Sequence, residues 1–240
     1  MRAPRVALYE PYTANMGAGW TQWLLDYFRV PYTVVKNADF RNGSLRAKYD
    51  TIILASQSVQ SILHGTREGA AASGARSDGR QRPEYTGGIT LAGLAAIDEF
   101  VKGGGTLICF DTATELPVQF FPLPVTARIR AAATTGDGAE SSGNSGFYSP
   151  GSVLRMTVEN GSPLTAGMPR EAHLFTTGGQ AWDINLMSEF NKGERETKAV
   201  VRYANTNLLA SGWLSGERTI TGKAALVQAR HGQGQVVLIS

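Results

Sequence analysis

The sequence is poor in the residues from which many functional sites are built. Its 240 residues include one cysteine, Cys109, and three histidines. A single cysteine excludes an internal disulfide framework and a metal site made of several thiolates. His64, His173 and His231 lie far apart and outside any spacing that places two metal ligands on one face, so we expect each of them at a surface or in a turn.

Positive charge is also sparse, because 23 Lys and Arg stand against 20 Asp and Glu and leave a net charge of +3 without any basic cluster. Binding to nucleic acid or to an anionic membrane needs clustered positive charge, so we predict neither partner. No apolar run reaches the roughly eighteen residues of a membrane span, and the chain as given shows no signal peptide. Neither a P-loop nor a dinucleotide-binding glycine pattern occurs, so no nucleotide cofactor is expected.

What the sequence does contain is an alternation of strands and helices in its first half. Short apolar runs predict buried strands over Val6–Tyr9, Tyr32–Val35, Tyr49–Ala55 and Thr106–Phe110. With helices between them, this alternation predicts an α/β fold with a flavodoxin-like, doubly wound and mostly parallel sheet.

Two helices are indicated by apolar periodicity. The first carries an aromatic stripe that we expect to pack against the sheet: Trp20, Trp23, Leu24, Tyr27 and Phe28. The second spans Ile89–Lys102, with Thr90 as its cap and a buried face made of Leu91, Leu94, Ile97 and Val101.

The second half is strand-rich. Strands are predicted over Ser152–Val158, His173–Thr176, Ala199–Tyr203, Leu208–Trp213, Ala224–Ala229 and Gln235–Ile239, the last two joined by a turn at 231–234. We expect a single domain over 1–240, with a doubly wound core at 1–125, a flexible loop at 131–146 and a strand-rich continuation at 150–240. His64–Gly88 is expected to be a second long loop. Because the last apolar strand stops abruptly, truncation at the C-terminus is also expected.

Ligands of doubly wound folds bind beyond the carboxyl ends of the strands. This rule nominates the polar residues that follow the first, third and fourth strands: Glu10, Tyr12, Asn15, Ser56, Gln57, Asp111, Thr112, Thr114 and Glu115. The alternative is that these side chains cap helices and tie turns.

Cys109 is a tempting nucleophile, but its neighbours Ile108 and Phe110 are too bulky for a strained nucleophile elbow. We therefore predict a buried, inert thiol, and position 111, where the elbow would fall, is an aspartate. The four tryptophans could form a sugar platform, although Trp20, Trp23, Trp182 and Trp213 all stand in apolar patterns that favour packing.

Several uncommon strings carry a family resemblance that spans nearly the whole chain. They are Arg5–Tyr12, Gly19–Trp23, Pro83–Gly88, Gly103–Asp111, Tyr148–Ser152, Gly167–Pro169 and Ser211–Leu214. Together they resemble the class I glutamine amidotransferase-like domain that follows the catalytic domain in large secreted bacterial zinc carboxypeptidases of the carboxypeptidase A type.

The resemblance implies a non-catalytic accessory domain, covalently linked to a peptidase domain and located outside the cytoplasm. Zinc would belong to that absent peptidase domain, and no cofactor is expected in this chain. The best remaining surface for a peptide or cell-wall ligand would include Tyr12, Gln57, Tyr85 and Asp111. Two alternatives remain open, which are a hydrolase that uses Cys109 or the Asp111 and Glu115 carboxylates, and a carbohydrate-binding module.

Overall fold

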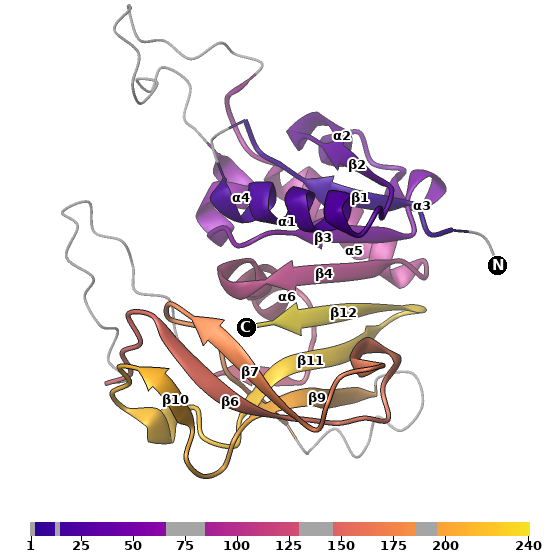
Figure 1. Cartoon of the computed structure of the whole chain (residues 1–240). Coiled ribbons are helices and arrows are strands. Elements are labelled where there is room, and N and C mark those ends of the chain that lie inside the picture. Colours follow the sequence, from indigo (N-terminus) through magenta and orange to yellow (C-terminus); the bar gives the residue numbers. More distant parts are fainter. Residues whose placement is uncertain (1–2, 13–14, 66–84, 130–145, 186–195) are drawn as a thin grey trace, which may run out of the picture. The chain divides into compact units, whose positions relative to one another are not determined.

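The computed structural model describes residues 3–12, 15–65, 85–129, 146–185 and 196–240. The expected loops over 64–88 and 131–146 lie largely outside these residues. The chain divides into two compact units (Figure 1). The first comprises Met1–Leu116 with His231–Gln235, and the second comprises Pro117–Arg230 with Val236–Ser240. The single domain over 1–240 stays a prediction.

The first unit is built on four parallel strands. β1 (Val6–Tyr9) lies between β2 (Tyr32–Val35) and β3 (Thr51–Leu54), and β3 pairs with β4 (Thr106–Phe110). The spatial order β2-β1-β3-β4 is that of flavodoxin-like sheets, which confirms the predicted fold class.

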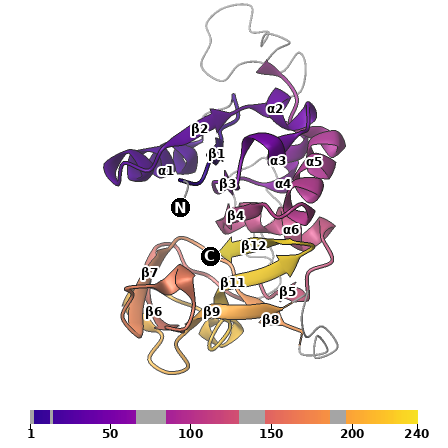
Figure 2. The same cartoon turned by 90° about the vertical axis from the view of Figure 1, so that its right-hand side faces the viewer.

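Helices cover both faces of this sheet (Figure 2). α1 (Met16–Tyr27) lies on one side, and α3 (Leu45–Lys48), α4 (Val59–His64) and α5 (Thr90–Lys102) lie on the other. α2 (Asn37–Arg41) packs beside α5. The sequence did not reveal α2, α3 and α4, because helices of four to six residues are too short to show a periodic apolar face.

Successive strand residues face opposite sides of the sheet. On the α1 side, Val6, Leu8 and Ile53 form a small core against which Leu25 and Val30 pack. Leu107 and Cys109 point to the opposite face, where both are fully buried. Both faces therefore bury apolar side chains, as the unbroken apolar strands predict.

The predicted orientation of α1 is wrong. Trp20, Trp23 and Tyr27 are 63%, 55% and 68% exposed, and Leu24 and Phe28 are exposed as well. The buried residue of the helix is the small Ala18, and Leu25 packs onto the sheet. Periodicity shows which residues share a face of a helix, but it does not show whether that face meets the core.

α5 ends at Lys102 as predicted but begins one residue later than predicted, at Thr90. Leu94, Ile97 and Val101 are buried as expected, whereas Leu91 is 67% exposed. Thr90 does not cap the helix, since Ile89 holds the cap position without a side-chain hydrogen bond and Thr90 has a φ of 63°.

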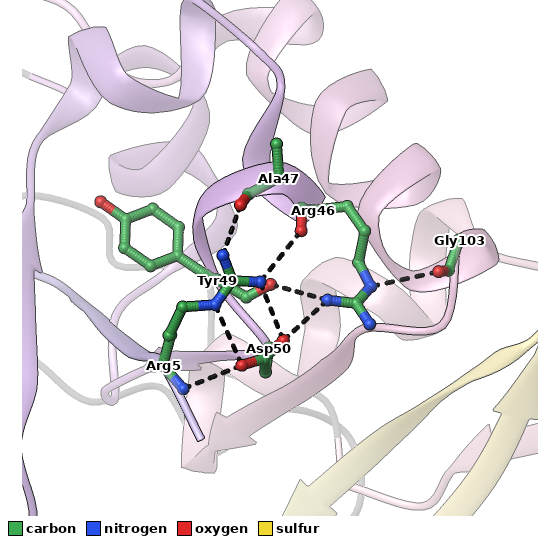
Figure 3. A network of polar contacts seen from close by, with 6 residues as sticks. All are labelled: Arg5, Arg46, Ala47, Tyr49, Asp50 and Gly103. Atoms are coloured by element: carbon green, nitrogen blue, oxygen red, sulfur yellow. Dashed lines mark hydrogen bonds and ion pairs between the residues drawn. The ribbon is translucent and has the colours of Figure 1, made fainter. Parts of the chain in front are cut away.

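The amino ends of the strands are joined by a charged network (Figure 3). The Asp50 carboxylate accepts from Arg5 Nη2 at 2.9 Å and from Arg46 Nη1 at 2.8 Å. Arg46 Nε also donates to the Gly103 carbonyl at 3.1 Å. This network ties β1, α3 and β3 to the end of α5, at the sheet edge opposite the strands' carboxyl ends.

The second unit is mainly antiparallel. β6 (Ser152–Val158) pairs with β7 (Glu171–Thr176), β9 (Thr197–Tyr203) and β10 (Leu209–Gly212), and β9 pairs with β11 (Ala224–His231). β12 (Gly234–Ile239) follows β11 through the predicted turn. The three-residue strands β5 (Val125–Ala127) and β8 (Trp182–Ile184) were not predicted. The core of the second unit includes Leu154, Met156, Val201 and Ile220.

Trp182 is buried in the second unit, as its apolar context predicts, but Trp213 is 69% exposed. The expectation that all four tryptophans are packed is therefore correct for Trp182 alone. None of the helices in the described part of the chain is long and apolar enough to cross a membrane.

Candidate functional site

The carboxyl ends of β3 and β4 are joined by a hydroxyl that bonds to a carboxylate. Ser56, which follows β3, donates from Oγ to Asp111 Oδ2 at 2.7 Å. The same Oγ lies 3.1 Å from Thr112 Oγ1. The topological rule had nominated all three residues, and the structure brings them together.

Asp111 lies in the turn directly after β4, at the position where the sequence analysis expected a nucleophile elbow to fall. β4 ends at Phe110, a 3-10 turn spans Asp111–Thr114, and α6 (Glu115–Phe120) follows. Asp111 has a φ of 44°, in the left-handed region that Asp tolerates better than most residues. The strained turn is present, but it displays a carboxylate.

Asn15 connects α1 to this edge of the sheet. Its Oδ1 accepts from the Ala18 amide at 3.0 Å and caps α1. Its Nδ2 donates to the Ser56 carbonyl at 3.2 Å and to Gln57 Oε1 at 3.4 Å. Asn15 therefore caps a helix, which was the alternative to ligand binding, and its side-chain amide also positions Gln57.

A second cluster forms beyond β1 and β2. Lys36 Nζ donates to Glu10 Oε2 at 2.6 Å, and Gln22 Nε2 donates to Glu10 Oε1 at 3.2 Å. The hydrogen bond from Lys36 outweighs burial and holds the pKa of Glu10 below its ordinary value. Glu10 is thus an ionised partner of Lys36.

Two tyrosine rings stand beside this ion pair. Tyr12 and Tyr85 have ring centroids 4.7 Å apart, and Lys36 Nζ lies 5.2 Å from the centroid of the Tyr12 ring. Tyr12 is 40% exposed and Tyr85 is 37% exposed, so both rings remain open to a ligand. Exposed aromatic rings next to fixed charges are typical of binding surfaces.

The remaining nominated residues have other places. Thr114 is buried and its hydroxyl donates to the Asp111 carbonyl, so it ties the turn. Glu115 begins α6. Lys36 and Gln22 were missed, although Lys36 directly follows β2 and the same topological rule could have found it.

The Cys109 side chain is fully buried, and burial raises the pKa of its thiol. Since a reactive cysteine needs access and a lowered pKa, this environment favours the inert thiol that the bulky neighbours predicted.

His231 borders the predicted turn, but it does not lie at the surface. This residue is 6% exposed, and its Nε2 lies 2.6 Å from Asp98 Oδ1 on α5. The sequence analysis placed it in the turn, but it is the last residue of β11 and is buried beside α5. Among residues 3–12, 15–65, 85–129, 146–185 and 196–240, no three His, Cys, Asp or Glu side chains are grouped to hold a metal ion. The absence of a cofactor from this chain stays a prediction.

No protein-family model and no curated protein sequence matches the chain. Solved structures do match in fold. PurLQS from Thermotoga maritima has a TM-score of 0.53 and 13% identity, over 98% of this chain and 85% of that one. A ThuA-like protein from Parabacteroides merdae gives 0.51 and 10%, over 99% and 79%. A cytoplasmic protein from Salmonella typhimurium LT2 gives 0.52 and 12%, over 98% and 86%.

These similarities show the fold alone, which is glutamine amidotransferase-like and flavodoxin-like. The glutamine amidotransferase-like part of the sequence resemblance is confirmed at the level of fold.

Proposed function

We propose that this chain is a binding domain with a glutamine amidotransferase-like fold that does not hydrolyse glutamine. The turn after β4 carries the proposal. Asp111 occupies it with a φ of 44°, and the nearby thiol, Cys109, is buried two residues earlier. Hydrolysis of glutamine by this class of fold needs an accessible and activated thiolate, and neither residue supplies one.

The ligand we propose is a peptide, free or in a cell wall. The rings of Tyr12 and Tyr85 offer apolar faces, and the Asp111 carboxylate, already oriented by Ser56, can accept N–H groups of a peptide. The fixed Glu10–Lys36 pair adds one charge of each sign beside the rings. A surface with aromatic faces and both kinds of charge suits a zwitterionic peptide.

More specifically, we propose that this chain is the accessory domain of a zinc carboxypeptidase-like protein. The support is the sequence resemblance of the strings described above. The domain would then be linked covalently to a peptidase domain that holds the zinc and would be exported with it.

The proposed lack of catalytic activity is tested with the purified chain. We expect no ammonia from L-glutamine, and no C-terminal amino acid from peptides with or without added zinc. Zinc-dependent release of amino acids would overturn the proposal. Glutamine hydrolysis that Asp111→Asn abolishes would also overturn it and would favour the carboxylate hydrolase instead.

The binding part is tested by calorimetric titration with a synthetic cell-wall stem peptide that has a free carboxyl terminus. Tyr12→Ala should weaken binding about fivefold or more, since truncating a contacting aromatic residue removes more than about 1 kcal/mol. The matched control is Tyr148→Ala, a 46% exposed tyrosine of the second unit, which should bind like the wild type. No binding, or equal losses in both variants, would contradict a peptide site at Tyr12.

A further inference from the structure

The outer side of α1 carries an uncovered apolar surface. We name the following residues the α1 stripe: Met16, Trp20, Trp23, Leu24, Tyr27 and Phe28, which are 80%, 63%, 55%, 50%, 68% and 66% exposed. Their spacing places them along one side of the helix. Figure 2 shows α1 on the side of the sheet that faces away from α3, α4 and α5.

The aromatic rings of the α1 stripe form a continuous row. Ring centroids of Trp20 and Trp23 lie 6.0 Å apart, those of Trp23 and Tyr27 lie 5.5 Å apart, and those of Tyr27 and Phe28 lie 5.1 Å apart. These contacts hold the rings in place before any partner binds. An ordered aromatic surface is favourable for binding, because little side-chain entropy remains to be lost.

The ring geometry disfavours a sugar as the occupant. Trp20 stands at 84° to Trp23, and Trp23 stacks face to face on Tyr27 at 22°. Trp23 and Tyr27 therefore each turn a face toward the other, and Trp20 meets Trp23 edge to face, so the row offers no set of coplanar, free ring faces on which a sugar would stack.

The charge of α1 disfavours a membrane or a charged partner. Asp26 is the one charged residue among the twelve residues of the helix. A helix that lies on a membrane surface carries Lys and Arg on its polar face, and α1 has neither. The α1 stripe is uncharged, so its natural complement is another uncharged apolar surface.

The area of the α1 stripe matches a homodimer interface. Four aromatic residues of about 150–250 Å² each, on average nearly two thirds exposed, offer on the order of 500 Å². A standard interface buries about 800 Å² per partner, and about 65% of a homodimer interface is apolar, which again gives about 500 Å². The α1 stripe alone therefore offers about the apolar area that one partner contributes to such an interface.

We propose that the α1 stripe is the centre of a homodimer interface, in which α1 packs against α1 of a second copy of this chain across a two-fold axis. A two-fold axis places the same surface on both partners, so one self-complementary apolar stripe is sufficient. Trp23 contacts both Trp20 and Tyr27 and lies mid-stripe, which makes it the expected hot spot.

The test is the mass of the full chain by sedimentation velocity over a dilution series. We expect about twice the 25.7 kDa of one copy, with dissociation on dilution. Trp23→Lys should weaken the dimer about thirtyfold or more, because it buries an unpaired charge at a hot spot. The matched control is Trp213→Lys, which changes a 69% exposed tryptophan of the second unit and should leave the dimer intact.

Thermal unfolding of each variant monitors folding, and Tyr27→Lys replaces Trp23→Lys if the latter unfolds. A wild-type chain that stays monomeric at every concentration would overturn the proposal, as would a dimer that neither α1 variant weakens. Binding of a monomeric chain to phosphatidylglycerol vesicles, or quenching of its tryptophan fluorescence by a glycan, would assign the stripe to another occupant. Mass is measured without peptide, so this result is independent of the proposed peptide binding.

Discussion

The imidazole of His231 contacts the carboxylate of Asp98, with Nε2 2.6 Å from Oδ1. Lys102 binds the other carboxylate oxygen, Oδ2, at 2.5 Å. Burial raises the pKa of Asp98, but the hydrogen bonds from Lys102 and His231 together lower it below the ordinary value. The ionised carboxylate thus fastens the turn after β11 to α5, within the first unit.

Asp98→Asn should lower the free energy of unfolding by about 1–2 kcal/mol near pH 7, because a charged acceptor is lost. A carboxylate whose pKa is depressed in the folded state stabilises that state above its unfolded pKa of about 3.9. This stabilisation disappears as the pH falls through the folded pKa. Urea unfolding from pH 7 to pH 3 should therefore show the two proteins converging in acid. Glu99→Gln, a change to an exposed neighbour on α5, is the control, and a gap that does not vary with pH would exclude ionisation as its cause.

Gly105 and Gly19 should respond to alanine in opposite ways. A Cβ at Gly105 would lie 2.4 Å from two ring atoms of Phe100, which is 1% exposed and has no room to move. Gly105→Ala should lower the unfolding free energy by about 1–3 kcal/mol. Gly19 lies in α1 with nothing within 4 Å, so Gly19→Ala should stabilise by about 0.5–1 kcal/mol. Urea unfolding of both variants tests the pair, and effects of the same sign would contradict this packing.

Apolar patterns predicted the strands of the sheet because a strand that is buried on both faces needs apolar residues at nearly every position. Val6–Tyr9 is buried at every position, and such a run reads as a parallel strand without further information. The alternation with helices then left few arrangements, and the flavodoxin-like order is one of them. The same reasoning failed for α1, because a face that meets the core and a face that meets solvent or a partner have the same periodicity.

The candidate site could be predicted only in part. The topological rule placed Ser56 and Asp111 at one edge of the sheet, where a hydrogen bond joins them. It could not show that the Tyr85 ring contacts the Tyr12 ring, since these residues are far apart in the sequence and share no motif. Asp98 and His231 are 133 residues apart and belong to no motif, so their pairing was invisible in the sequence.

The stability of the protein should depend on which residue occupies position 111, because that residue accepts a hydrogen bond and has a positive φ. Asp111→Ala removes the acceptor of the Ser56 hydroxyl and places alanine at a φ of 44°, so we expect a loss of about 1–3 kcal/mol. Asp111→Asn keeps an acceptor oxygen and a residue that tolerates this region, so it should lose less. Thermal and urea unfolding of the two variants give the comparison. Equal losses would contradict the prediction, because they would mean that neither the acceptor oxygen nor the tolerance of a positive φ gives asparagine an advantage over alanine here.

Labelling of Cys109 separates the inert thiol from a catalytic one. Because its side chain is fully buried and burial raises its pKa, iodoacetamide should react only when the surrounding structure opens. If the open fraction is on the order of one molecule in a thousand or less, labelling of the native protein should be at least about a thousandfold slower than labelling in urea. Mass spectrometry over a time course at neutral pH measures both rates on the same chain, which has no other thiol to confuse the count. Rapid native labelling would place the sulfur at an accessible surface and would reopen the hydrolase interpretation that uses Cys109.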